Sequence, residues 1–144
     1  MKKLFLSFAS SIMRGSGFVL VAFWVLFAGS AFGQDIRVKP MTWELDSAIN
    51  LQNNRGMSYQ GQIKTQRDQS LQWIQRGGQK VSNYQVVRTE GNWADVQQNG
   101  SITYYLTHDG HDCVAIFQRT SQNTSVTIDF GGGVRSKFIV GSIK

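Results

Sequence analysis

The sequence predicts an all-β protein, an antiparallel β-meander of about eight or nine strands that folds into a small barrel or sandwich after a cleaved signal peptide. Three observations support this fold class. Apolar and polar residues alternate with a period of two along most of the chain after Pro40. Turn-forming residues interrupt the alternation every ~6–11 residues, which is the spacing of a meander. No segment has the apolar spacing of a helix long enough to connect parallel strands.

Residues 1–33 have the pattern of a secretory signal peptide. The apolar run from Phe18 to Ala28 is about half of the ~20 residues that a membrane-spanning helix needs. We therefore expect cleavage after Gly33 and a secreted or periplasmic protein, without stable insertion in the membrane. Residues 34–144 then form a single all-β domain. The basic residues before the run are Lys2, Lys3 and Arg14, and the small residues after it are Ala31 and Gly33.

The net charge gives little support to a nucleic-acid partner. The whole chain has a net charge of +6, but three of these charges lie in the signal peptide, so the mature domain retains +3. The remaining lysine and arginine residues are scattered singly, with no run that would follow a phosphate backbone. We therefore expect no nucleic-acid binding.

Each strand is predicted from its own alternation and from the turn residues that bound it. The first strand begins after the only proline, and five of its apolar residues fall on one side: Met41, Trp43, Leu45, Ile49 and Leu51. The predicted strands are residues 41–52, 57–66, 70–76, 80–90, 93–98, 101–108, 111–120, 124–130 and 134–143. The turns between them are residues 53–56, 67–68, 77–78, 90–92, 99–100, 109–110, 121–123 and 131–133.

The number of strands favours closure of the sheet. Closure removes aggregation-prone edges, and about eight strands make a barrel whose interior is filled or holds one small ligand. Glutamine is abundant but dispersed along the strands, which indicates an uncharged, solvated face. Examples are Gln60, Gln62, Gln72, Gln75 and Gln85.

The segment HDGHDC, residues 108–113, contains both histidines and the only cysteine. A two-residue type I′ turn at Asp109–Gly110 would pair His108 with His111 and Leu106 with Cys113. This register buries Cys113 on the core face and leaves the histidines at the rim. The two histidines and a thiolate could meet one zinc ion, but the fourth ligand would have to be a distant carboxylate. We therefore predict a solvated hairpin tip and no metal site.

The sequence favours a protein that is not an enzyme and holds no cofactor. Cys113 is predicted to be buried, whereas a cysteine nucleophile needs an exposed, electropositive setting. Asp109 and Asp112 fall on a turn and on the opposite face, which is a poor arrangement for paired acid and base. The chain lacks the sequence motifs of serine hydrolases, zinc proteases, P-loops and dinucleotide sites. A hydrolase whose acid and base come from separate strands stays open.

A candidate binding face follows from the preceding turn. A three-residue loop at 98–100, with Gly100 in a left-handed bulge, would place Val96 opposite Ile102 and turn Trp93 and Tyr105 outward as a cross-strand pair. Paired aromatic rings among carboxylate and hydroxyl groups suit the stacking of a sugar or the seating of a partner's side chain. The predicted binding residues are Trp93, Tyr105, Asp95, Thr103, Thr107 and Asp112.

Another layer over this face, with Val114 and Ile116 in its core, is the alternative interpretation. We therefore expect an exported, small β-barrel-like binding protein that recognises a carbohydrate or another envelope protein through an aromatic face. The other functional hypotheses are a structural envelope protein with no small ligand, a metal-binding protein and a hydrolase. No particular oligomeric state is predicted.

Overall fold

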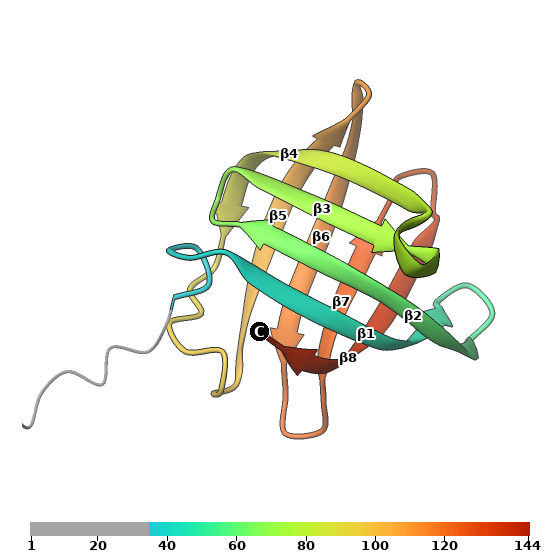
Figure 1. Ribbon diagram of the computed structural model, residues 1–144, viewed down its shortest axis with the longest axis horizontal. Coiled ribbons are helices and arrows are strands. Elements are labelled where there is room, and N and C mark those ends of the chain that lie inside the picture. Colours follow the sequence, from blue (N-terminus) through green and yellow to red (C-terminus); the bar gives the residue numbers. More distant parts are fainter. Residues whose placement is uncertain (1–34) are drawn as a thin grey trace, which may run out of the picture. The chain divides into compact units, whose positions relative to one another are not determined.

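The computed structural model describes residues 35–144, which form a closed antiparallel barrel of eight strands (Figure 1). Each strand pairs with the next one in the sequence, and the last strand pairs with the first. The strands are β1 (Met41–Asn50), β2 (Arg55–Gln66), β3 (Ser70–Gln75), β4 (Lys80–Glu90), β5 (Gly100–His108), β6 (His111–Arg119), β7 (Thr124–Asp129) and β8 (Arg135–Ile143), with a short 3-10 helix η1 (Arg76–Gly78). The predicted all-β meander is confirmed, as a barrel. The predicted signal peptide lies outside the described residues.

The predicted ninth strand, residues 93–98, is wrong, because this segment is a loop between β4 and β5. Its polar groups bond within the loop and to one side chain of β6, since Arg119 donates to the carbonyl of Val96 at 3.1 Å. The Trp93 indole N–H donates to the carbonyl of Gln98 at 2.9 Å, and the Asp95 carboxylate accepts the backbone N–H of Gln97 at 2.9 Å. A loop that satisfies its own backbone in this way has no need of a sheet partner.

The predicted alternation of β1 holds only as far as Leu45. The pairing of β1 shifts at Asp46 against both of its neighbours, β2 and β8, so the later residues change sides. Ala48 packs against the core, where the sequence predicted Ile49, and Leu51 is exposed in the following turn. Bulges of this kind bend a strand sharply, and a small barrel needs such bends to close.

One end of the barrel is closed by the segment at residues 35–40 and the loop at residues 91–99, and we call it the closed end. Aromatic side chains fill it around Trp43, whose ring centroid lies 5.8 Å from that of Trp93 and 4.8 Å from that of Phe117. The Trp43 indole N–H donates to the Thr65 hydroxyl at 3.3 Å. Since Ile36 and these aromatic side chains are almost completely buried, this end carries much of the hydrophobic stabilisation.

The hairpin of β5 and β6 has the predicted register. His108 pairs with His111 and Leu106 with Cys113, and the turn residues Asp109 and Gly110 have φ values of 49° and 76°. Positive φ at both central positions is what a type I′ turn requires. Cys113 is buried, as predicted, because the register points it into the barrel.

Replacing Trp93 by alanine should lower the free energy of unfolding by about 3–5 kcal/mol, because it truncates a tryptophan in the packed closed end. Chemical denaturation monitored by circular dichroism measures this change. Val87→Ala is the control, since Val87 is 65% exposed on β4 and its truncation should change stability by less than about 0.5 kcal/mol. A loss for Trp93→Ala no larger than that of the control would contradict the buried placement.

Gly100 is the first residue of β5 and does not adopt the predicted left-handed conformation. Glycine is required there because the Trp93 indole packs directly on its backbone, so that a Cβ would lie only 2.8 Å from the indole Nε1. Gly100→Ala should therefore destabilise the protein by about 1–3 kcal/mol through overpacking. Thermal or chemical denaturation measures this loss of stability. Gly56→Ala on β2 is the matched control, because a Cβ there would meet its nearest atom at 3.9 Å. Equal melting of the two variants would refute the steric role of Gly100.

Candidate functional site

Four of the six predicted binding residues share the outer face of β5 and β6, and two do not. Thr103, Tyr105 and Thr107 alternate with buried residues of β5, and Asp112 pairs with Thr107 across the hairpin. The outward placement of Trp93 is wrong, because Trp93 is buried in the closed end. Asp95 is partly exposed but lies in the loop before β5, where its carboxylate bonds within the loop and not on the strand face that carries Tyr105. Tyr105 therefore has no aromatic partner across the strands. Its neighbours in the register are Arg88 and Val114.

The ring of Tyr105 is already covered by a side chain of the protein. The Arg88 guanidinium lies 3.5 Å from the Tyr105 ring centroid, and the Tyr105 hydroxyl donates to the Glu90 carboxylate at 2.8 Å. Arg88 also pairs with Glu90, and these two partners hold the pKa of that carboxyl below its usual range. We call Arg88, Glu90 and Tyr105 the outer triad. A sugar could stack on the face of the ring that Arg88 covers only by displacing the guanidinium.

Within residues 35–144, no second layer covers the outer face. Val87 and Ile116 are exposed there, at 65% and 38%. A shallow hollow of about 400 Å³ brings Tyr105 and Asp112 together with Arg88 and Val87. The alternative of a covering layer is therefore wrong for the described part of the chain, and the face is a surface.

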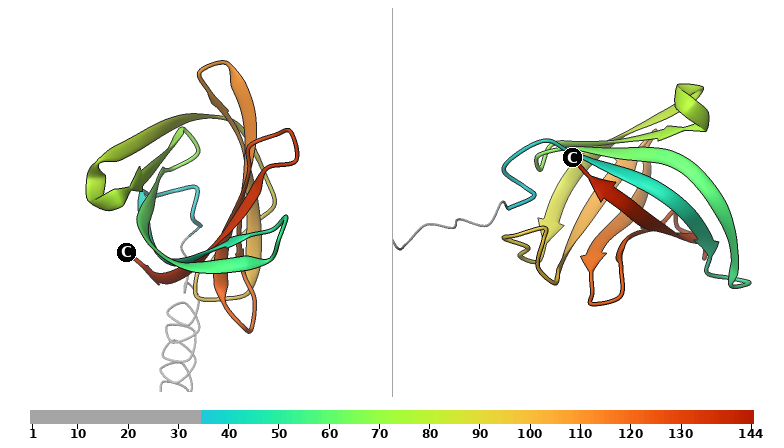
Figure 2. Two further views of the ribbon diagram at one scale, coloured as in Figure 1. Left: turned by 90° about the vertical axis from the view of Figure 1, so that its right-hand side faces the viewer. Right: turned by 60° about the horizontal axis from the view of Figure 1, so that its bottom comes forward.

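The β1–β2, β3–β4, β5–β6 and β7–β8 turns lie at the opposite end of the barrel (Figure 2, left). This end contains a second aromatic cluster. Trp73 of β3 lies at the centre, with its ring 5.8 Å from Phe130 and 5.3 Å from Phe138 of β8. Tyr59 of β2 lies 5.1 Å from Phe138. We call Tyr59, Trp73, Phe130 and Phe138 the aromatic mouth. Phe138 is its buried floor, and the other three are partly exposed.

The position of Tyr59 depends on a glycine of the same strand. A Cβ at Gly61 would lie 2.6 Å from the Tyr59 ring and 3.0 Å from the carbonyl oxygen of Ile74. Because Gly61 has no side chain, the Tyr59 ring can pack against the backbone there and contact Phe138. This is the close approach for which glycine is suited within a strand.

Two polar atoms of the aromatic mouth are buried without a hydrogen-bond partner within residues 35–144, namely the Tyr59 hydroxyl oxygen and Nε1 of Trp73. Burial raises the pKa of Tyr59, and the nearby Trp73 N–H and Arg76 charge act in the opposite direction. The N–H lies beside the hydroxyl, but the two groups do not reach hydrogen-bonding geometry. Each unpaired buried group costs about 1–3 kcal/mol, so such groups in folded proteins require an explanation.

The tryptophans of the closed end give a direct comparison. Both Trp43 and Trp93 donate their N–H groups, to Thr65 and to Gln98, whereas Trp73 does not. The hydroxyl of Tyr104 is also unpaired, but Tyr104 is fully buried in the core, where a solute has no access. Among the described residues, unpaired buried donors on partly exposed side chains therefore occur at the aromatic mouth.

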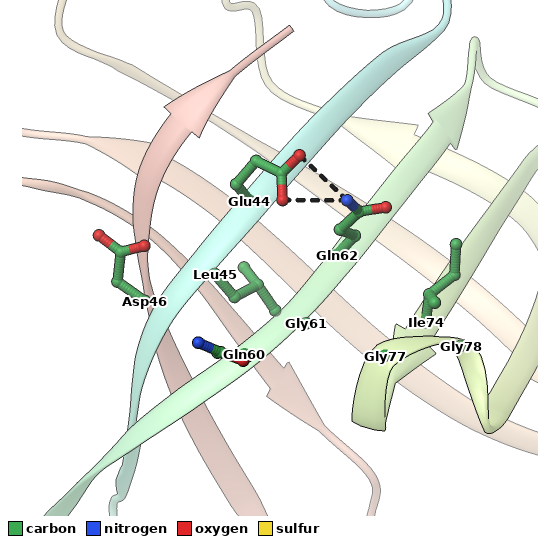
Figure 3. A pocket seen from close by; sticks show the side chains of 9 residues that line it. All are labelled: Glu44, Leu45, Asp46, Gln60, Gly61, Gln62, Ile74, Gly77 and Gly78. Carbon is green, nitrogen blue, oxygen red and sulfur yellow. Dashed lines mark hydrogen bonds between the residues drawn. The ribbon is translucent and has the colours of Figure 1, made fainter.

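A third feature is a polar hollow of about 500 Å³ on the outside of β1, β2 and β3 (Figure 3). Glu44 accepts two hydrogen bonds from the Gln62 amide at 3.0 Å and one from Lys144 at 3.1 Å. Lys144 and Gln62 thereby lower the pKa of the Glu44 carboxyl. The Glu44 carboxylate is thus satisfied internally, and the Asp46 carboxylate also lines the hollow.

The histidines of the β5–β6 hairpin have separate surroundings. Nδ1–H of His108 donates to the carbonyl of Asn83 at 2.6 Å, and its ring packs on Tyr84 at 4.8 Å. His111 is exposed. In the described ranges, no three histidine, cysteine, aspartate or glutamate side chains lie close enough to hold a metal ion.

Cys113 should react slowly with a thiol reagent in the native protein. Burial raises the pKa of its thiol, and the Asp112 charge adds to the rise, so the reactive thiolate is scarcer than for an exposed cysteine at the same pH. Labelling with a chromogenic aromatic disulfide at mildly alkaline pH measures the rate, and the same protein in denaturant supplies the fast reference. Native labelling as fast as the denatured reference would be inconsistent with this burial.

Comparison of the chain with protein-family models, curated proteins and solved structures finds no match. In the part of the chain that the structure describes, no helix has the length and apolar character needed to cross a bilayer. The features that bear on function are therefore the outer triad, the polar hollow and the aromatic mouth. Only the last combines accessible aromatic rings with unpaired polar donors.

Proposed function

We propose that this chain is an exported, non-enzymatic binding protein that holds a small ligand with a flat face, such as a sugar or an aromatic ring, at the aromatic mouth. The observation that carries the proposal is the pair of unpaired donors, Tyr59 hydroxyl and Trp73 N–H, within a partly exposed aromatic cluster. An eight-stranded barrel is wide enough to hold one small ligand, and most ligand sites combine apolar walls with a few polar groups. Export is supported by the signal pattern of residues 1–33.

The ligand would contact the cluster in two ways. A flat ring would stack on Trp73 and Phe130, whose own rings lie within 28° of parallel. An acceptor atom of the ligand would take the Trp73 N–H and remove the cost of leaving it unpaired. These interactions bind a solute without changing it, which fits a protein that is not an enzyme.

Docking of another envelope protein on the outer face is the second candidate. It is supported by Val87 and Ile116, which are exposed on the face that carries the outer triad. Tyr105 and Arg88 would then contribute the aromatic and arginine side chains that are enriched at protein interfaces. The outer face also carries the four binding residues of β5 and β6 that were predicted from the sequence.

Trp73→Leu should weaken ligand binding at least about fivefold, because it removes both the stacking surface and the N–H donor. The probe is N-phenyl-naphthylamine, a neutral aromatic amine, whose fluorescence is followed in a titration. Maltotriose and chitotriose are then tested as competitors, and their displacement of the probe would assign the site to carbohydrate.

Tyr105→Leu is the matched control, an aromatic-to-leucine change outside the barrel. Loss of probe binding with Trp73→Leu but not with Tyr105→Leu supports the aromatic mouth. Loss of probe binding with Tyr105→Leu but not with Trp73→Leu would instead place the site on the outer face. Absence of probe binding in the unmodified protein overturns the proposal. Circular dichroism melts of both variants establish that they remain folded under the assay conditions.

A further inference from the structure

The unpaired groups of the aromatic mouth restrict the chemistry of what binds there. An indole N–H can only donate a hydrogen bond, so the partner of Trp73 must present an acceptor. The Tyr59 hydroxyl is a donor as well as an acceptor. Because the hydroxyl lies beside the Trp73 N–H, a ligand oxygen that reaches both groups could accept a hydrogen bond from each of them.

The charge around the aromatic mouth is unevenly distributed. The β1–β2 and β3–β4 connections contain Arg76 and no acidic residue, and the strand residues that directly follow them are Arg55 and Lys80. None of these three basic residues forms a salt bridge within residues 35–144. The β5–β6 and β7–β8 side contains aspartates instead, and the only arginine there is paired with one of them.

The register directs two of these cations toward the barrel axis. Arg55 has the same alternation as the inward Tyr59 of β2, and Lys80 has the same alternation as the inward Tyr84 of β4. Each of them occupies the paired position that adjoins the turn of its hairpin. Arg76 follows β3 directly and is close enough to Tyr59 for its charge to act on the hydroxyl. Arg76 is therefore near the Tyr59 hydroxyl, and Arg55 and Lys80 lie at the same end of the barrel, on the strand faces that carry Tyr59 and Trp73.

The apolar rim supplies the remaining contact surface. Met57, two residues before Tyr59 on the inward face of β2, is 62% exposed. Leu51 and Val134 are exposed on the adjacent turns, which are tied together by the Gln52 side-chain amide donating to the carbonyl of Gly133 at 2.8 Å. Exposed apolar side chains beside cations suit a ligand with an apolar body and one charged end.

We propose that the ligand of the aromatic mouth is an organic anion, with its ring on Trp73 and Phe130 and its acidic group toward Arg76 and Lys80. This inference rests on the proposed function and adds the charge of the ligand to it. The acidic oxygens accept from the Trp73 N–H and the Tyr59 hydroxyl while the cations balance their charge. A neutral ring of the same shape would keep the stacking and lose the ionic contribution.

The test compares two fluorescent probes that differ by one acidic group: neutral N-phenyl-naphthylamine and anilinonaphthalene sulfonate. The unmodified chain should bind the sulfonate about fivefold more tightly than the neutral probe, since exposed cations attract an anion only modestly in water. The double variant Arg76→Gln/Lys80→Gln should lose that preference and bind the neutral probe within about twofold of the unmodified affinity. Added salt should weaken sulfonate binding and leave the neutral probe unchanged.

The double variant Lys64→Gln/Arg67→Gln is the control, because it removes the same charge from β2 and the β2–β3 turn, at the other end of the barrel. It should retain the preference for the sulfonate. Equal affinities of the two probes would overturn the inference, and so would an equal loss of the sulfonate preference in the two double variants. In either case, binding of the neutral probe that depends on Trp73 would leave the proposed function standing. Failure of both probes to bind overturns the two together.

Discussion

The pairing of β1 with β8 is the contact on which the rest of the barrel depends. It joins the two ends of the meander, so that every strand has two neighbours and no edge stays open. The join needs a bend, and the register shifts at Asp46 against both neighbouring strands provide it. Gly141 of β8 leaves space for the Asp46 carboxylate, which would collide with any Cβ at that position. A glycine in one strand thus permits the bulge in the next.

Closure produces two ends with different physical roles. At the closed end, Trp43 and Trp93 are buried, their N–H groups are satisfied, and the chain covers its own core. At the other end, Trp73 has the same chemistry but is partly exposed, and its N–H has no acceptor in hydrogen-bonding geometry among residues 35–144. A well-packed closed end allows the protein to tolerate unpaired groups elsewhere. The free-energy cost of one such group is small compared with the stabilisation gained by burying several aromatic side chains. Departures from full hydrogen bonding at a partly exposed position are typical of functional sites.

The outer face and the aromatic mouth use arginine and tyrosine in opposite ways. In the outer triad, Arg88, Glu90 and Tyr105 satisfy one another, which leaves little unbalanced charge for a partner. Beside the aromatic mouth, Arg76 has no carboxylate partner within the described residues. A self-neutralised cluster stabilises a surface weakly, whereas an unpaired cation retains its attraction for an external anion.

The sequence by itself determined the features that depend on neighbouring residues. Strand alternation and the Asp109–Gly110 turn are local, so the β-meander, the β5–β6 register and the burial of Cys113 were predicted correctly. Only the tertiary structure decided the rest. Trp93 turns inward because a loop side chain follows no alternation, and the bulge at Asp46 arises from the demands of closure. The aromatic mouth joins residues from β2, β3, β8 and the end of β7, and no pattern within one strand reveals which residues a closed barrel brings together at one end.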